Sequence, residues 1–452
     1  MDKRNNKLEL LGNAPVPKAL MALGIPIMIG MLINALYNLV DAYFVGGLGE
    51  SQMGAISIVF PLGQVVVGLG LMFGNGAASY LSRLLGRGDK KRADKVASTA
   101  LCSSVLTGAV LILVLIIFLK PVLFLLGATE TILPYALTYA KIYVISSILN
   151  VFNVTMNNIV SSEGAAKTTM CALLLGAVLN IGLDPIFIYT LGLGVAGAAI
   201  ATAISQFVST LVYLNYVFQG KSAFAFRLKH FDPDKEMITE ILKIGIPTLT
   251  FQLLASLSIA LINRAANNYG DAVIAGMGAV TRITSMGTLV VFGFLKGFQP
   301  VAGFSYGAKN FDRLREAIRT SVLWSTAFCI AAGVLMAVFS ARIIAGFTEG
   351  NMEMISVGQR SLVANGLSFF FFGFHTVYSS LLLATGKGRA GFFLGACRQG
   401  ICFVPVILLL PLIWGMDGIL CAQPAADLLS AVITVFVAIS VHRELAVQQI
   451  LP

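Results

Sequence analysis

The sequence predicts an all-α polytopic membrane protein with twelve transmembrane helices in two six-helix lobes. Composition is the first basis: 57% of the 452 residues are hydrophobic and only 12% are charged, about half the charge of a soluble domain. The second is the length of the uncharged runs. Residues 97–119 and 193–218 contain 23 and 26 residues without a charge, and about 20 helical residues cross a bilayer core of about 30 Å. The third is an internal repeat.

Hydropathy and charge together predict the spans and their direction. The predicted spans are residues 18–45, 53–80, 96–119, 132–160, 168–189, 194–219, 240–268, 273–302, 317–340, 354–384, 390–413 and 418–441. Loops after even-numbered spans are basic, as in residues 83–95. Loops after odd-numbered spans contain only two basic residues, Lys120 and Arg342. Because cytoplasmic loops carry the excess of Lys and Arg, we expect both termini in the cytoplasm and the chain in the cell (inner) membrane.

The repeat has an offset of about 221 residues. It pairs Gly24-Ile25-Pro26 with Gly245-Ile246-Pro247, Gly49 with Gly270, Gly86 with Gly307, Gly164 with Gly386, and Gly194 and Gly197 with Gly415 and Gly418. Six spans per copy is an even number, so both copies run in the same direction and relate by a pseudo-two-fold axis along the membrane normal. We therefore predict an N-terminal lobe at residues 1–219, a cytoplasmic inter-lobe loop at 220–236 and a C-terminal lobe at 237–452.

Several function classes are disfavoured. The net charge of +10 resides in short loops, not in a basic patch with interleaved aromatics, so we expect no nucleic-acid partner. The chain has no His-Glu-x-x-His motif, no Ser/His nucleophile pair and no phosphate-binding loop, which argues against an enzyme and against ATP-driven transport by this chain alone. Its six cysteines show no metal-ligand or redox spacing. We expect no cofactor, and a monomer surrounded by membrane lipid.

Apart from Glu240 at the very start of the seventh span, the carboxylates inside the predicted spans are Asp41, Asp184 and Asp427. An ionisable group at membrane depth is costly and is by default a sign of function. Asp41 and Asp184 both lie about five residues before the outer end of an odd-numbered span, which places them about 7–8 Å below the surface at equal depth. Their equal depth in one lobe predicts a shared site.

Polar side chains share helix faces or depth with these carboxylates. Asn34 and Asn38 precede Asp41 by seven and three residues, and Asn180 precedes Asp184 by four, spacings that stack side chains on one stripe. On spans four and six, Tyr139 lies at similar depth, Thr202 a little deeper, and Asn157 deeper again. Two carboxylates with amide and hydroxyl oxygens suit a hard cation or a proton. The alternative is a structural network that holds the spans together.

The second lobe has a different set of charges. Arg282 lies near the predicted midplane and Asp427 at like depth, so we predict that they pair; the alternative is that Arg282 alone lines an aqueous cavity. Lys296 and Arg398 lie nearer span ends, where long basic side chains snorkel. His375 is expected to be a satisfied interior histidine rather than a proton relay. Pro26 is the expected hinge, because bending the first span would move Asp41 relative to the fifth; a static kink is the alternative.

Several segments resemble bacterial members of the multidrug and toxic compound extrusion (MATE) family. They are residues 37–46 (YNLVDAYFVG, beginning at Tyr37), 57–61, 82–86, 180–186, 197–205, 243–247 and 384–389, with Gly24-Ile25-Pro26. The resemblance covers nearly the whole chain, and the closer likeness is to the branch with an ion site in the N-terminal lobe. The predicted seventh span has no acidic residue after Glu240 at its cytoplasmic start, and the tenth has none, so a carboxylate cation site in the second lobe is not expected.

The resemblance implies an antiporter that exports cationic amphiphilic compounds in exchange for Na⁺ or H⁺. It implies an ion site at Asp41, Asn180, Asp184 and Thr202. If Na⁺ is the coupling ion, these four residues are the expected ligands. It also places Tyr139 and Asn157 in the supporting network, to which we add Tyr37, Asn34 and Asn38. The alternative is a flippase for a lipid-linked sugar in the wider superfamily; those proteins tend to have fourteen spans and a basic cavity, whereas twelve spans are predicted here.

Overall fold

The computed structural model describes residues 3–347 and 351–450. The elements are α1 (Lys3–Gly12), α2 (Val16–Gly46), α3 (Glu50–Arg87), α4 (Lys90–Ile117), α5 (Leu119–Leu125), α6 (Leu133–Ser162), α7 (Ala166–Pro185), η1 (Ile186–Thr190), α8 (Gly194–Phe218), η2 (Leu228–His230), α9 (Lys235–Ala266), η3 (Asn267–Tyr269), α10 (Asp271–Gly307), α11 (Phe311–Val338), α12 (Ser340–Ala345), α13 (Met352–Ala384), α14 (Gly388–Ala396), η4 (Cys397–Ile401), α15 (Phe403–Trp414), α16 (Met416–Leu420) and α17 (Ala422–Ile450). Among the described residues, twelve helical segments are long and apolar enough to cross a membrane, which confirms the predicted number.

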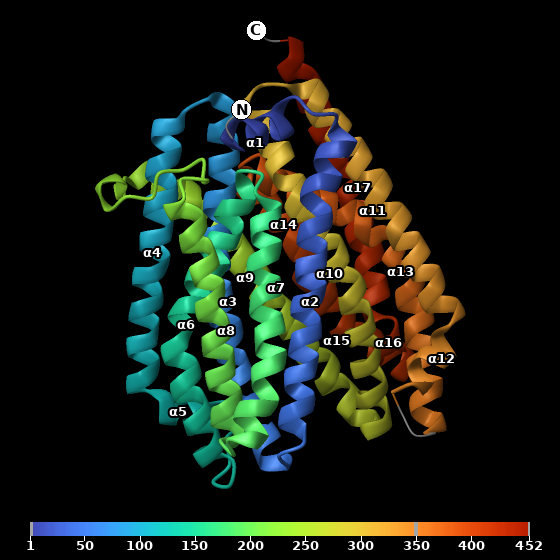
Figure 1. Cartoon of the computed structure of the whole chain (residues 1–452). Coiled ribbons are helices and arrows are strands. Elements are labelled where there is room, and N and C mark those ends of the chain that lie inside the picture. The colour runs from blue at the N-terminus through green and yellow to red at the C-terminus, as the bar shows by residue number, and fades with distance from the viewer. Residues whose placement is uncertain (1–2, 348–350, 451–452) are drawn as a thin grey trace.

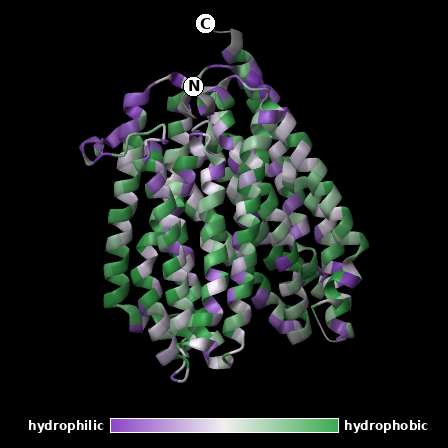
Figure 2. Cartoon of the chain, in the orientation of Figure 1, coloured by the Kyte–Doolittle hydropathy of each residue, from purple (hydrophilic) through white to green (hydrophobic). Residues whose placement is uncertain are grey.

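The spanning helices run roughly side by side, and α1 and the last turn of α17 lie at the same end of the bundle (Figure 1). We call this end the terminal end. Hydrophilic residues gather there, while the helices below it consist largely of hydrophobic residues (Figure 2). Many large apolar side chains of these helices are well exposed, including Phe60, Leu113, Leu323 and Phe436. Exposed apolar surface on this scale marks contact with lipid.

Two spans are not continuous α-helices. The fifth ends in the π-helical turn η1, directly after Pro185, and the eleventh is divided into α14, the π-helical turn η4 and α15. A π-turn inserts an extra residue into the helix and re-aims the side chains near it, and such turns occur often at functional sites. The first break lies beside the buried Asp184, and the second contains Arg398, whose side chain is 12% exposed.

The two lobes are related as the repeat predicts. A methyl group added at Gly86 would collide with the backbone of Phe304, and one added at Gly307 would collide with the backbone of Arg83. Each of these residues is 221 positions from its counterpart, so the contact is reciprocal, as a two-fold interface requires. Gly164 and Gly386, another pair of the repeat, both have left-handed backbones, with φ of +83° and +82°. The lobes therefore share one framework around a pseudo-two-fold axis.

Close contacts between the lobes occur toward the terminal end. The Oγ of Ser79 donates to the carbonyl of Leu383 at 2.5 Å, and Arg83 forms an ion pair with Glu240 at 3.1 Å. Gly76 and Gly245 allow α3 and α9 to approach backbone to backbone. Small residues permit such approach between membrane helices, so the lobes are packed together at this end.

Candidate functional site: a carboxylate pair in the N-terminal lobe

Asp41 on α2 and Asp184 at the end of α7 lie next to each other. Their carboxyl groups are close enough to interact electrostatically, which places the two predicted carboxylates in one site. Asp184 is completely buried, and Asp41 is only partly exposed. Two adjacent carboxylates repel when both are ionised, and a shared proton or a bound cation removes the repulsion.

Asn180 links Asp184 to the neighbouring helix α8. Its Nδ2 donates to Oδ1 of Asp184 at 3.3 Å and to Oγ1 of Thr202 at 3.4 Å. One oxygen on each of Asp41, Asn180 and Asp184 is buried without a hydrogen-bond donor from the described residues. Buried acceptors are normally satisfied, and oxygen ligands of this kind suit a hard cation. The four residues Asp41, Asn180, Asp184 and Thr202 thus come together in the structure, and the acceptors fit a cation or a proton.

Tyrosine rings close one side of this pair. The phenol groups of Tyr37 and Tyr139 lie near both carboxylates. Tyr139 stacks on Tyr143, with ring centroids 5.9 Å apart and planes inclined by 11°. Tyr143, four residues after Tyr139 on α6, belongs to this wall, and the i, i+4 spacing in the sequence was the available signal. Tyr139 is buried, and electrostatic interactions are stronger in such a water-poor environment than in bulk water.

Asn34 and Asn38 lie on the same helix as Asp41, and the structure records a bond between them. The Nδ2 of Asn38 donates to the backbone and side-chain oxygens of Asn34, at 2.8 and 3.1 Å. Asn38 is exposed and Asn34 is partly exposed. These two amides therefore interact with each other along the helix.

At the end of the bundle opposite the terminal end, the local sequence explains how α2 and α7 are held together. The backbone bends into η1 after Pro185, and the Tyr189 hydroxyl donates to the carbonyl of Phe44, near the end of α2. Gly197 on α8 faces the backbone of Phe187, where a methyl group would collide. The Asp-Pro step, the tyrosine and the glycine thus fix the ends of the helices that carry the two carboxylates.

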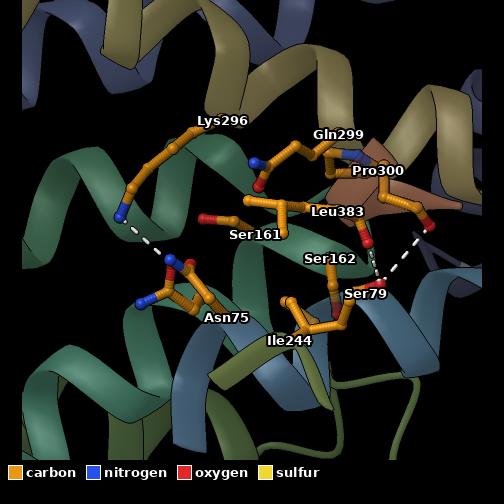
Figure 3. Close-up of a pocket in the computed structure, with 12 residues that line it drawn as sticks. Asn75, Ser79, Ser161, Ser162, Ile244, Lys296, Gln299, Pro300 and Leu383 are labelled. Carbon is orange, nitrogen blue, oxygen red and sulfur yellow. Dashed lines mark hydrogen bonds between the residues drawn. The ribbon is translucent and has the colours of Figure 1, made fainter. Parts of the chain in front are cut away.

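Asn157 belongs to a second polar cluster, at the interface between the lobes. It is eighteen residues from Tyr139 on α6, about 27 Å along the helix. Its Nδ2 donates to the Tyr213 hydroxyl at 3.3 Å, and Lys296 of α10 donates to Oδ1 of Asn157 at 3.5 Å and of Asn158 at 3.1 Å. Lys296 lines a small cavity together with Asn75, Ser79 and other residues of both lobes (Figure 3). Its ammonium group therefore lies against the first lobe and does not snorkel to a span end.

The predicted pair of Arg282 and Asp427 is wrong. Arg282 is exposed on α10, and Asp427 is bonded instead by Arg398, whose Nε lies 2.8 Å from Oδ1. Gln423 donates to the same oxygen at 2.8 Å, and Ser368 donates to Oδ2 at 3.1 Å. The π-turn η4 contains Arg398 and aims it inward, over the ring of Phe372. Both carboxylate oxygens of Asp427 are therefore satisfied.

His375 is a satisfied interior histidine, as predicted. It is 4% exposed, and its Nδ1 lies 2.8 Å from Oγ1 of Thr434. Pro26 lies inside the continuous helix α2, where it removes one backbone hydrogen bond. Within the described part of the chain, no group of three or more His, Cys, Asp or Glu side chains is arranged to hold a metal ion. The N-lobe site thus combines only two acidic groups with neutral oxygens.

Twelve membrane-spanning helices in two like-oriented lobes, with a buried carboxylate pair inside one lobe, define a membrane transporter. The chain belongs to the MatE family: the family model matches twice, at residues 26–186 and 247–409. The two matches begin 221 residues apart, the offset of the repeat. MATE proteins are transporters, so the chain is a transporter and not an enzyme.

Characterised relatives and solved structures align over almost the full length. Multidrug export protein MepA of Staphylococcus aureus is 29% identical over 98% of both chains, and the protein of the same name from Staphylococcus saprophyticus is 29% identical over 99% of this chain and 98% of its own. A structure described as the outward-facing conformation of a multidrug resistance MATE family transporter has a TM-score of 0.92 and 27% identity, covering 98% of each chain. MATE structures in straight and bent conformations also match, with TM-scores of 0.92 and 0.91, identities of 27% and 28%, and 98% of each chain covered.

Proposed function

We propose that this transporter is a secondary active multidrug efflux antiporter that exports cationic amphiphilic compounds in exchange for Na⁺ or H⁺. The observation that carries the proposal is the set of three buried oxygens without donors, one each on Asp41, Asn180 and Asp184, beside two adjacent carboxylates. The names of the relatives, which describe multidrug export, support the substrate class. We also propose that the protein is a monomer in the cell membrane and that both of its termini lie in the cytoplasm.

The proposed coupling follows from charge. With neither proton nor cation bound, the carboxylates of Asp41 and Asp184 repel each other. Loading with Na⁺ or H⁺ removes the repulsion and draws α2 and α7 together, with Pro26 as the bend. Movement of α2 against its neighbours changes the space available to a bound drug. An ion shifts a conformational equilibrium only by its difference in affinity for the two states, so the ligands of the ion are the residues that couple its movement to export.

The test is efflux of a fluorescent organic cation from vesicles, with a Na⁺ gradient and a pH gradient imposed separately. Asp41→Asn and Asp184→Asn should insert normally but lose gradient-driven efflux, because an amide cannot be loaded and emptied. Asn180→Ala and Thr202→Ala should weaken ion affinity, with less loss at saturating ion. Asp417→Asn is the matched control, since Asp417 lies in an exposed ion pair with Arg360, and it should retain efflux. Near wild-type efflux by both site variants would refute the ion site.

A further inference from the structure

The short helix α1 contacts both lobes at the terminal end. It ends at Gly12, and its side chain Leu11 is completely buried among core residues of both lobes. A methyl group at Gly12 would lie 3.0 Å from the ring of Phe304 on α10 of the second lobe, and one at Gly164 of the first lobe would lie 3.5 Å from Leu11. A helix in this position connects the lobes outside the membrane-spanning bundle.

The attachment of α1 to the first lobe is a buried polar cluster centred on Glu163. Glu163 follows α6, is completely buried, and accepts hydrogen bonds from the Tyr216 hydroxyl, the Ser222 hydroxyl and the backbone N–H of Ala223. Lys7 of α1 lies 3.8 Å from its carboxylate, and donates to the Tyr216 hydroxyl and to the carbonyl of Lys221. Buried charges held by several partners are costly to separate, so this attachment is firm.

The attachment to the second lobe is of a different kind. One side chain of α11, Arg313, donates to the carbonyls of Leu10, Leu11 and Ala14 at the end of α1. A helix end exposes carbonyls that lack partners in the helix, and it attracts positive charge. Beside this contact, a cavity of about 590 Å³ lies between α1 and the second lobe, lined by Leu8, Asn13, Phe304, Ala308 and other residues. The Glu163 cluster is ionic and buried, whereas the contact with the second lobe consists of the packing of Leu11 and Gly12 against apolar residues and of three hydrogen bonds from one guanidinium group to backbone carbonyls.

From this asymmetry we infer that α1 is a clasp: it stays with the first lobe throughout transport, and its bonds to Arg313 hold the lobes together at the terminal end. When the lobes separate there, the three carbonyl bonds of Arg313 break and the Glu163 cluster stays intact. The clasp adds to the contacts of Ser79 and of Arg83 with Glu240. The clasp thereby contributes to the fraction of molecules in which the terminal end is closed.

The test measures opening of the terminal end directly, so it does not depend on the proposed ion or substrate. A single cysteine replaces Ala78, which is only partly exposed and lines the cavity between the lobes, in a background without other reactive cysteines. Arg313→Met should raise its labelling rate by a water-soluble thiol reagent at least about tenfold, since tenfold is the factor expected for the loss of even one of the three charge-assisted hydrogen bonds. Arg313→Lys keeps the positive charge but not the several N–H donors of the guanidinium group, so its labelling rate should lie between those of wild type and Arg313→Met. Arg315→Met is the matched control, because Arg315 contacts Asp312 and the carbonyl of Leu445 within its own lobe.

Hydrogen exchange of the backbone of α1 tests which lobe keeps the helix. In Arg313→Met, α1 should retain most of its protection because the Glu163 cluster holds it. In Glu163→Ala, α1 should lose protection even though Arg313 is present. Labelling of Arg313→Met at the wild-type rate, or loss of α1 protection in Arg313→Met but not in Glu163→Ala, would overturn the inference.

Discussion

Removing the guanidinium of Arg398 should destabilise the second lobe strongly. Asp427 is 4% exposed and the Arg398 side chain is 12% exposed, so the pair is shielded from water. In Arg398→Met the carboxylate keeps only the neutral donors Gln423 and Ser368. Breaking a buried pair by removing one partner costs about 3–5 kcal/mol, and we expect the free energy of unfolding to fall by this amount.

Replacing both partners should restore much of the stability. Arg398→Met with Asp427→Leu removes both charges and leaves apolar side chains of similar size, an exchange that is often neutral or stabilising for buried pairs. We expect the double variant to recover about half of the single-variant loss or more. Stability would be measured by denaturant unfolding in detergent, with all variants under the same lipid and salt conditions.

Arg282→Met is the control that separates this pairing from the one predicted from sequence. Arg282 is exposed, so its loss should change the free energy of unfolding by no more than about 0.5 kcal/mol. A loss below about 1 kcal/mol for Arg398→Met, or a double variant as unstable as the sum of the two single variants, would refute the reasoning.

Three further predictions concern the lobe interface, the Glu163 cluster and the membrane orientation. Gly307→Ala should lower the free energy of unfolding by about 1–3 kcal/mol through overpacking, whereas Gly278→Ala, which has open space around it, should not; equal stability of the two would contradict the close contact. Burial raises the pKa of Glu163 above its ordinary 4.5, so the folded protein binds a proton on Glu163 more tightly than the unfolded chain does, and the stability of wild type relative to Glu163→Gln should fall as pH rises above about 4.5. If unfolding curves measured across a pH series showed the stability of wild type relative to Glu163→Gln rising with pH, folding would lower the pKa of Glu163 and the prediction would be wrong. A cysteine at Thr190 should react with an impermeant reagent on intact cells and one at Lys387 only after permeabilisation, and the reverse pattern would invert the expected orientation.

Much of the fold was predictable because membrane helices are recognisable from length and hydropathy alone. The repeat was visible through glycines such as Gly86 and Gly307, which the structure places at a contact that only small residues permit. In the site, the spacing of Asn180 and Asp184 along one helix predicted a contact that the structure records. Equal depth likewise predicted that Asp41 and Asp184 could meet across helices. Depth and same-helix spacing are properties that a sequence expresses directly.

The partner of Asp427 was not predictable by the same means. Depth from the span ends placed Arg282 level with it, but depth does not specify the direction in which a side chain points around its helix. The π-turn η4 alters that direction at Arg398, and nothing in the residue pattern marks such a turn. Asn157 illustrates a related limit, since its contacts with Lys296 depend on packing between the lobes. Contacts between distant segments thus required the structure.

The two lobes share a framework but differ in how the carboxylates inside their membrane-spanning helices are bonded. In the second lobe Arg398 supplies a permanent positive charge to Asp427, and every carboxylate oxygen has a donor. In the first lobe Asp41 and Asp184 each retain a buried oxygen without one. A carboxylate neutralised by its own chain has no differential affinity to offer an external cation, whereas the first-lobe pair changes charge whenever an ion or proton arrives. Under the proposed antiport, coupling therefore resides in the first lobe, and the second lobe serves as the rigid partner against which it moves.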